Sequence, residues 1–196
     1  MNRKVLIIGV GGIGSYLAPL LNQTGLYNIS IADPDSLEKK NYMYQNYCEA
    51  RVAASGKRKK VEALDLKGRV TRIPYAILTD KQLVGYDLVI CCADNLDVRR
   101  LLYRQGFGEG CMSKWLDLRA QGRNAAIISY LSDKKYSDTF LAGPEGSFSC
   151  QGEDFNKSMN PTDLHFMHTV VAGFAAQWIQ RWFNGDEVAD KMFLNG

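Results

Sequence analysis

The residues best suited to chemistry lie close to the amino terminus, in a glycine-rich stretch. Gly9, Gly11 and Gly14 have the spacing Gly-x-Gly-x-x-Gly, after a short apolar run and before a segment with helical spacing. Glycines let a phosphate approach the backbone, and the N–H groups that begin a helix attract its charge. Asp33 follows Gly14 by about 20 residues, where a carboxylate can accept hydrogen bonds from ribose hydroxyls. The pattern predicts a nucleotide site, but it does not distinguish ATP from a nicotinamide or flavin dinucleotide.

Further polar groups follow along the chain, and each has a structural alternative to a role in binding. The basic run from Lys57 to Lys60 suits either phosphate binding or the solvated start of a helix. Asp94 and Asn95 follow an apolar run, where they either bind a ligand or cap the next helix. Arg99 is either a ligand-binding residue or part of an ion pair on a helix surface.

The elements that must position these residues form an alternation of short strands and helices. Val5 to Val10 is an unbroken apolar run ending in glycine, as in a parallel strand that is buried on both faces. Together with the next helix and strand it predicts a βαβ unit. The predicted strands are 5–10, 28–32, 70–77 and 87–92, and the predicted helices are 13–22, 56–65 and 96–105, with irregular polar chain over 36–56 and a short helix or turn at 79–84.

The carboxyl-terminal third differs, because two strands follow each other with only a turn between them. Asp163 is the predicted N-cap of a last helix, whose apolar stripe would contain Leu164, Met167, Val171, Phe174, Trp178 and Trp182. We therefore expect one domain over residues 1–196, an α/β fold with a Rossmann-like, mostly parallel sheet, helices on both faces and an antiparallel carboxyl-terminal extension. The expected elements here are strands at 115–118 and 125–130 around a turn at 121–124, a polar loop at 142–161 and a helix from 163 to 183.

Composition excludes several classes of protein. The net charge of +3 is too mild for a nucleic-acid-binding protein, which concentrates basic residues on one face. Five cysteines without regular spacing do not form a disulfide framework, and no Cys-x-x-Cys pair suggests structural zinc. No apolar stretch is long enough to span a membrane, and no cleavage-site pattern precedes the first strand. We expect a cytoplasmic protein that binds neither nucleic acid nor membranes.

Four motifs in this order resemble the adenylating enzymes of the ThiF/MoeB/HesA family, which are related to the ubiquitin-activating enzymes. The resemblance covers residues 4–130 well and the remainder loosely. Each motif is weak singly, and their order carries the resemblance. The motifs are the loop from Gly9 to Ser15 with its double glycine, Asp33-Pro34-Asp35 followed by Asn41, the Gly-x-x-x-Lys-Val-Glu-Ala segment from Gly56 to Ala63, and Asp94-Asn95-x-x-x-Arg99.

The resemblance implies an ATP-dependent adenylyltransferase that acts on the C-terminal carboxylate of a ubiquitin-like or sulfur-carrier protein ending in Gly-Gly. In such enzymes the carboxylate attacks the α-phosphorus of Mg·ATP and pyrophosphate leaves, which requires positive charge and a metal ion more than covalent help. Asp94 would bind Mg²⁺, helped by Asn95, and Lys60 or Lys59 would contact phosphates. Relatives are commonly dimeric, so we expect a homodimer. The other implied nucleotide-binding residues are Gly9, Gly11, Gly12, Gly14, Asp33 (for the ribose), Asp35 and Asn41.

The chain also departs from the family's pattern. Tyr44 stands where relatives have a triphosphate-binding arginine, and a phenol supplies no fixed positive charge. Relatives usually begin with helices that donate a second arginine to the partner subunit, and we expect no counterpart to them here. Arg51, Lys57 and Arg58 are the nearest basic substitutes. These departures support an alternative function, a catalytically impaired module that binds nucleotide or a partner, and an NAD(P)- or FAD-linked oxidoreductase is a second alternative.

One cysteine is a candidate nucleophile. Cys150 lies in the part of the chain where thioester-forming relatives carry a nucleophilic cysteine, and Cys111 is the second candidate. The alternative is an incidental thiol, because no histidine or basic cluster beside it in the sequence would lower its pKa.

Overall fold

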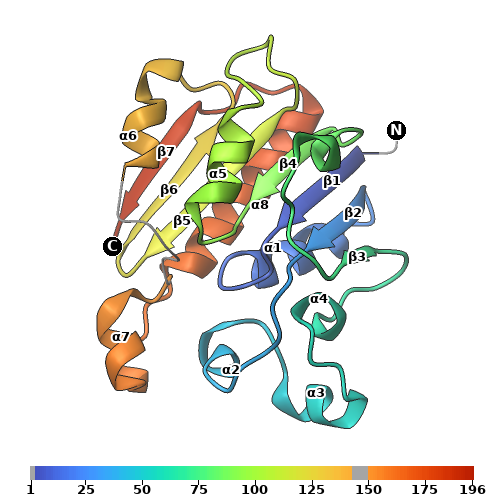
Figure 1. Ribbon diagram of the computed structural model, residues 1–196, viewed down its shortest axis with the longest axis vertical. Helices are drawn as coiled ribbons and strands as arrows, with labels where there is room; N and C mark the ends of the chain where they lie inside the picture. The colour runs from blue at the N-terminus through green and yellow to red at the C-terminus, as the bar shows by residue number, and fades with distance from the viewer. Residues whose placement is uncertain (1–2, 143–149) are drawn as a thin grey trace.

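The computed structural model describes residues 3–142 and 150–196, whose strands form one sheet with helices on both faces (Figure 1). The strand order is β3-β2-β1-β4-β5-β6-β7. Neighbouring strands run parallel from β3 across to β5, and β6 and β7 are antiparallel to their neighbours. The predicted fold class is therefore confirmed. The strands are β1 (Arg3–Ile8), β2 (Tyr27–Ala32), β3 (Thr71–Ile73), β4 (Leu88–Cys91), β5 (Trp115–Gln121), β6 (Asn124–Ser129) and β7 (Lys191–Asn195).

The helices cover the two faces of this sheet. In Figure 1, α5 lies on one face, while α1 and α8 lie together on the other. Among the described residues, no helix combines the length and apolar character needed to cross a lipid bilayer. The α-helices are α1 (Gly14–Asn22), α2 (Asn41–Tyr44), α3 (Glu49–Ser55), α4 (Lys60–Ala63), α5 (Leu96–Tyr103), α6 (Ser137–Leu141), α7 (Gly152–Ser158) and α8 (Met167–Asn184), and the 3-10 helices are η1 (Asp80–Leu83), η2 (Lys134–Tyr136) and η3 (Pro161–Asp163).

The central strands form because their residues are apolar on both faces. The last four residues of β1, of β2 and of β4 are all buried, so layers of helices on both sides remove them from water. β1 ends at Ile8 and not at Val10 as predicted, because Gly9 turns the chain with a φ of +88°. Similarly, Pro74 follows β3, which has only three residues, since proline lacks the N–H that continues a ladder.

The segment between β2 and β3 corrects two predictions. Residues 36–56 are not wholly irregular, because α2 and α3 lie within them. The helix predicted at 56–65 is wrong in its start and its length. Gly56, with a φ of +68°, ends α3 and donates its N–H to the carbonyl of Val52, and the next helix begins only at Lys60.

The carboxyl-terminal part requires further corrections. Asp163 does not cap the last helix, because it lies in η3 and Leu164 after it is extended, so α8 starts at Met167. The buried stripe of α8 includes Val171 and Trp178, whereas Phe174 is exposed. β7, α6 and α7 were not predicted. Of the loop predicted at 142–161, residues 143–149 lie outside the described residues.

Candidate functional site

A cavity of about 1040 Å³ opens at the carboxyl ends of the parallel strands. β1 and β4 are neighbours in the sheet although the chain visits β2 and β3 between them, and this reversal of strand order leaves a crevice where ligands bind in open α/β sheets. The glycine loop, the end of β2 and the end of β4 line one part of the cavity, and β5 and β6 line the other. Its polar lining includes Asp33, Asp35, Glu38, Lys40, Asn41, Gln45, Lys60, Asp94, Asn95, Arg99 and Arg119.

The four glycines of the loop differ in how much space a side chain would have at each position. A Cβ on Gly14 would lie 2.0 Å from the carbonyl oxygen of Gly9, and one on Gly9 would lie 2.8 Å from the nitrogen of Ala93. A Cβ on Gly12 would lie 2.4 Å from the Sγ of Cys150. Gly11 is different, since the nearest atom to its Cβ would be the Gln45 amide at 3.8 Å. Packing therefore requires three of the glycines, whereas Gly11 borders open space in the cavity.

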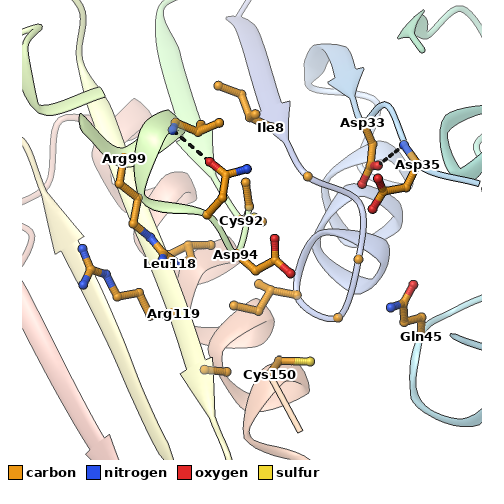
Figure 2. Close-up of a pocket in the computed structure, with 18 of the residues that line it drawn as sticks. Ile8, Asp33, Asp35, Gln45, Cys92, Asp94, Arg99, Leu118, Arg119 and Cys150 are labelled. Carbon is orange, nitrogen blue, oxygen red and sulfur yellow. Dashed lines mark hydrogen bonds between the residues drawn. The ribbon is translucent and has the colours of Figure 1, made fainter. Parts of the chain in front are cut away.

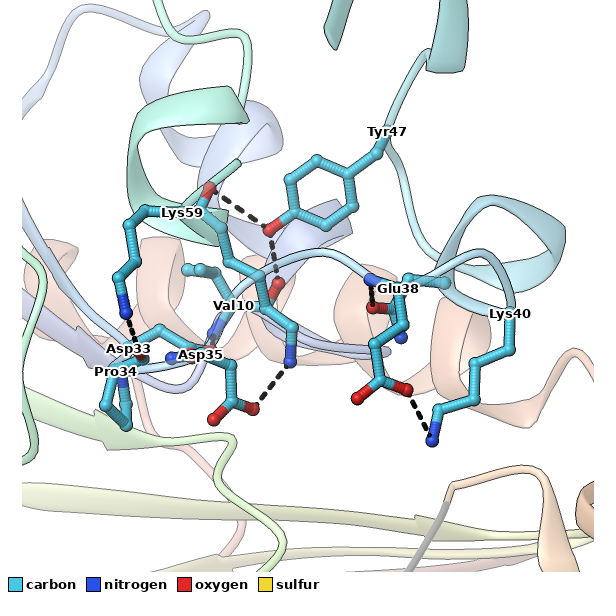
Figure 3. Close-up of polar contacts among 10 residues, drawn as sticks. Val10, Asp33, Pro34, Asp35, Glu38, Lys40, Tyr47 and Lys59 are labelled. Atoms are coloured by element: carbon cyan, nitrogen blue, oxygen red, sulfur yellow. Dashed lines mark hydrogen bonds and ion pairs between the residues drawn. The ribbon is translucent and has the colours of Figure 1, made fainter. Parts of the chain in front are cut away.

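The loop also presents hydrogen-bond donors. The N–H groups of Gly11, Gly12 and Ile13 have no acceptor among the described residues, as is usual where a helix begins. The N–H of Val10, in contrast, donates to Asp33 Oδ2 at 2.8 Å, and the Tyr47 hydroxyl donates to the Val10 carbonyl at 2.7 Å (Figure 3). The loop is thus fixed from its Val10 end and keeps three donors next to the cavity, which fits a phosphate group.

Asp33 sits at the end of β2 with both carboxylate oxygens engaged. Oδ2 accepts from Val10, and Oδ1 accepts from the N–H of Asp35 at 2.9 Å (Figure 2). Burial raises the pKa of Asp33, and the positive charge of Lys60 opposes that shift. Because a carboxylate oxygen has a second lone pair, these bonds leave room for a ribose hydroxyl. The ribose role of Asp33 stays a prediction.

The structure separates the two lysines that the sequence left as alternatives. Lys60 lines the cavity, and its Nζ lies 2.8 Å from Asp35 Oδ2. Although burial disfavours its charged form, Asp33 and Asp35 raise the pKa of Lys60. Lys59 is not among the residues that line the cavity, and its Nζ donates to the Pro34 carbonyl at 2.6 Å (Figure 3). The geometry therefore favours Lys60 as the phosphate-binding cation.

The basic residues expected to replace the missing arginine do not reach the cavity. Arg51 forms an ion pair with Asp65, and both line a separate small pocket together with Lys57. Arg58 is exposed, and its carbonyl accepts from the N–H of Leu37. None of the three substitutes lines the large cavity.

Asp94, just after the carboxyl end of β4, lies on the opposite side of the glycine loop from Asp33 (Figure 2), and Asn95 lines the same cavity. Asn95 Oδ1 accepts from the N–H of Val98 at 3.0 Å, so the helix-cap interpretation of Asn95 is confirmed. Within the described ranges, no three acidic, histidine or cysteine side chains gather around one point as metal ligands. A single carboxylate still fits Mg²⁺, which usually takes one or two protein carboxylates and completes its shell with phosphate oxygens and water.

Two polar side chains behind the loop are buried. Asn41 Oδ1 accepts from the N–H of Glu38 at 2.8 Å and so fixes the turn before α2. Gln45 lines the cavity with its Nε2 nearest to Gly11, whereas its Oε1 is buried without a hydrogen-bond partner in the described part of the chain. Burying an unpaired amide is unfavourable by about 1–3 kcal/mol. The unpaired oxygen therefore makes the packing behind the loop less favourable.

A buried charge network, which sequence reasoning missed, supports the wall formed by β5. Asp117 is fully buried and binds Arg99 Nε at 3.1 Å, Arg119 Nη2 at 2.7 Å and the Tyr103 hydroxyl at 2.9 Å. Burial disfavours ionisation of Asp117, but the two guanidinium groups hold its pKa below the usual range. Arg99 is itself buried, so the prediction of an ion pair holds but its placement on the helix surface is wrong. An aspartate between leucines in an apolar strand was the available indication.

Cys150 lies against the glycine loop and not in open solvent. Its Sγ is beside Gly12, it lines the cavity, and burial raises its pKa to about 12. At neutral pH such a thiol is protonated and therefore a poor nucleophile. Cys111 is not part of the cavity lining. The nucleophilic role of Cys150 stays a prediction.

Comparisons with known proteins agree with this geometry. The model of the ThiF family matches residues 1–195. Adenylyltransferase and sulfurtransferase MOCS3 of Drosophila yakuba is 31% identical over 108 residues, 52% of this chain and 24% of that protein. Molybdopterin-synthase adenylyltransferase of Escherichia coli is 32% identical over 113 residues, 52% of this chain and 43% of that protein. The matched regions thus span less than half the length of these relatives.

Solved structures of low identity share the fold. Escherichia coli MccB with ATP has a TM-score of 0.65 at 18% identity, over 100% of this chain and 60% of that chain. The same protein with MccA-N7isoASN has a TM-score of 0.69 at 20% identity, over 100% of this chain and 61% of that chain. At these identities the likeness shows the fold alone.

Proposed function

The chain belongs to the ThiF family, and from this membership we propose that it is an ATP-dependent adenylyltransferase. In the proposed reaction a carboxylate oxygen of the substrate bonds to the α-phosphorus of ATP. The bond from that phosphorus to the bridging oxygen breaks, so pyrophosphate leaves and an acyl adenylate remains. The observation that carries the proposal is one cavity whose wall holds the glycine-loop N–H groups that have no acceptor among the described residues, the ammonium of Lys60 and the carboxylate of Asp94.

Each of these groups has a part in binding the nucleotide. The N–H groups of Gly11 and Gly12 would donate to phosphate oxygens, with the partial positive charge of the α1 N-terminus behind them. Lys60 would share its ammonium between Asp35 and a phosphate. Asp94 would hold Mg²⁺, which when bound offsets the negative charge of the phosphates. Asp33 would orient the ribose, and Asn41, with Asp35, would keep the loop beside the cavity in position.

The other part of the cavity suits a thin polypeptide end. Its lining on β5 and β6 includes Ala120, Ala125 and Ala126, and it continues to Phe193 on β7. Small side chains leave space for an extended backbone with little side chain of its own. We therefore propose that the substrate is the carboxyl terminus of a small protein ending in Gly-Gly, of the ubiquitin-like or sulfur-carrier class. A homodimer in the cytoplasm completes the proposal.

Pyrophosphate exchange into ATP tests the proposed activity. The chain is incubated with ATP, Mg²⁺, labelled pyrophosphate and a panel of small proteins ending in Gly-Gly. We expect exchange with at least one of them, and Asp94→Asn should reduce it by about a hundredfold because a charge-stabilising contact is lost. Asp97→Asn is the matched control, since Asp97 is an exposed neighbour that pairs with Arg100. Equal exchange by the Asp94 and Asp97 variants would contradict the proposed role of Asp94.

A second candidate function rests on Tyr44. Its phenol lines the cavity where relatives have an arginine, and burial raises its pKa, so it stays neutral at physiological pH. A chain with this change could bind nucleotide without reacting. ATP binding without exchange for every carrier tested would favour such a module. Binding of NAD(P) or FAD without affinity for ATP would instead support an oxidoreductase.

A further inference from the structure

Around the glycine loop, carboxylates outnumber ammonium groups, which is unfavourable for binding a negatively charged triphosphate. Four carboxylates line this part of the cavity, and only two ammonium groups lie among them. The guanidinium groups of Arg99 and Arg119 line the same cavity but are already paired with Asp117, so a triphosphate beside the loop meets more carboxylates than unengaged cations, and like charges repel. Every available cation therefore matters for binding. The carboxylates are Asp33, Asp35, Glu38 and Asp94, and the ammonium groups are Lys40 and Lys60.

Lys60 and Lys40 differ in how strongly the neighbouring carboxylates hold their ammonium groups. The side chain of Lys60 is only 10% exposed, and both Asp33 and Asp35 raise its pKa. The side chain of Lys40 is 45% exposed and pairs with Glu38, which is 65% exposed, at 2.8 Å (Figure 3). Exposed pairs of this kind contribute little free energy, so another anion can replace the carboxylate readily. The ammonium of Lys40 can therefore leave its carboxylate partner for a ligand more easily than that of Lys60.

Lys40 lies on the wall of the cavity, together with Lys60 and Tyr44. The hydrogen bond to Glu38 raises the pKa of Lys40, and burial and the positive charge of Lys60 oppose that shift. Tyr44, whose phenol carries no charge at neutral pH, lines the same cavity as Lys40. Lys39, the adjacent residue, is exposed and does not line the cavity. Of the two neighbouring lysines, only Lys40 lines the cavity.

We propose that Lys40 binds the terminal phosphates of ATP, exchanging Glu38 for them, and so supplies the positive charge that Tyr44 lacks. The inference rests on the proposed ATP site. Lys40 is then a substrate-binding residue that recognises the part of ATP which leaves as pyrophosphate. Glu38 opposes it, because this carboxylate holds the ammonium when no nucleotide is bound and repels the phosphates when one enters.

Calorimetric titration of the full chain with Mg·ATP and with AMP tests this assignment. Lys40→Gln should weaken ATP binding about tenfold, the usual effect of losing one hydrogen bond to a charged group, and should leave AMP binding unchanged. Lys39→Gln removes the same charge one residue away and should leave both affinities unchanged. Glu38→Gln should strengthen ATP binding severalfold, and Lys40→Gln added to it should abolish that gain.

Other outcomes overturn the inference in distinguishable ways. Equal ATP affinities for Lys40→Gln and Lys39→Gln would contradict the role of Lys40 while leaving the proposed function intact. Equal weakening of ATP and AMP by Lys40→Gln would place Lys40 elsewhere than at the terminal phosphates. If the unmodified chain binds neither nucleotide, the proposed function fails and the inference with it. The melting temperature of each variant, compared with that of the unmodified chain, shows whether it is folded.

Discussion

Adding one methyl group to the glycine loop should destabilise the fold at Gly14 and not at Gly11. In Gly14→Ala the new Cβ would lie 2.0 Å from the Gly9 carbonyl oxygen, a backbone atom that cannot rotate away. Overpacking of this kind is unfavourable by about 3 kcal/mol, and the gain from replacing glycine by alanine in a helix offsets about 1 kcal/mol. The net loss of about 2 kcal/mol corresponds to a fall in Tm of about 4–8 °C for a chain of this length.

Gly11→Ala is the matched control within the same loop. Its Cβ would make an ordinary contact, 3.8 Å from the Gln45 amide, and its φ is not in the left-handed region. We expect a Tm within about 2 °C of that of the unmodified chain, because the change mainly reduces the freedom of the unfolded state. Scanning calorimetry measures both variants. A Gly14 variant that melts with the unmodified chain, or a Gly11 variant that melts as low as the Gly14 variant, would refute this description of the loop.

Three further predictions concern the buried groups around the cavity. Asp117→Asn should lower the free energy of unfolding by about 3–5 kcal/mol in urea titrations, since it removes the counter-charge of the buried Arg99 and of Arg119, whose side chain is 23% exposed. Because the folded pKa of Asp117 is low, the stability from this carboxylate is present above pH of about 4 and is lost as pH falls through the folded pKa. An unchanged unfolding curve would contradict the network. Burial lowers the pKa of His168, so below pH of about 6.5 the unfolded chain binds a proton there while the folded chain does not. Stability should therefore fall as pH falls from about 6.5 toward that lowered pKa. His168→Gln should remove this part of the pH dependence of Tm, and an identical pH profile for the variant would contradict the lowered pKa of His168. Iodoacetamide at pH 8 should label the exposed Cys48 much faster than the half-buried Cys150, whose pKa is about 12, and mass spectrometry that finds equal labelling would contradict the raised pKa of the Cys150 thiol.

The parts of the fold that could be predicted are those that local pattern determines. Strands buried on both faces are unbroken apolar runs, so β1, β2 and β4 were located to within about two residues. The hairpin of β5 and β6 was predicted because a polar turn separates two apolar segments. β7 escaped prediction because its five residues alternate without strong burial and are held by pairing with β6 across a long sequence separation.

The same distinction applies to the candidate site. The glycine loop and Asp33 have fixed spacing in the sequence, so both could be assigned to the cavity, and the structure places them there. The choice between Lys59 and Lys60 depends on the direction in which α4 begins, which sequence spacing does not determine. The network around Asp117 joins α5 to β5 across 18 residues of sequence, and only the folded sheet brings its charges together.

The measurement that tests the central claim most directly is a titration of the unmodified chain with Mg·ATP, NAD⁺ and FAD, repeated with Gly11→Ala. If the cavity beside the glycine loop is an ATP site, ATP binds saturably in preference to the dinucleotides. The methyl group in Gly11→Ala then weakens ATP binding without changing Tm, because it occupies space that the phosphates need. Preference for NAD⁺ or FAD, or ATP affinity that Gly11→Ala leaves unchanged, would contradict the assignment of this cavity.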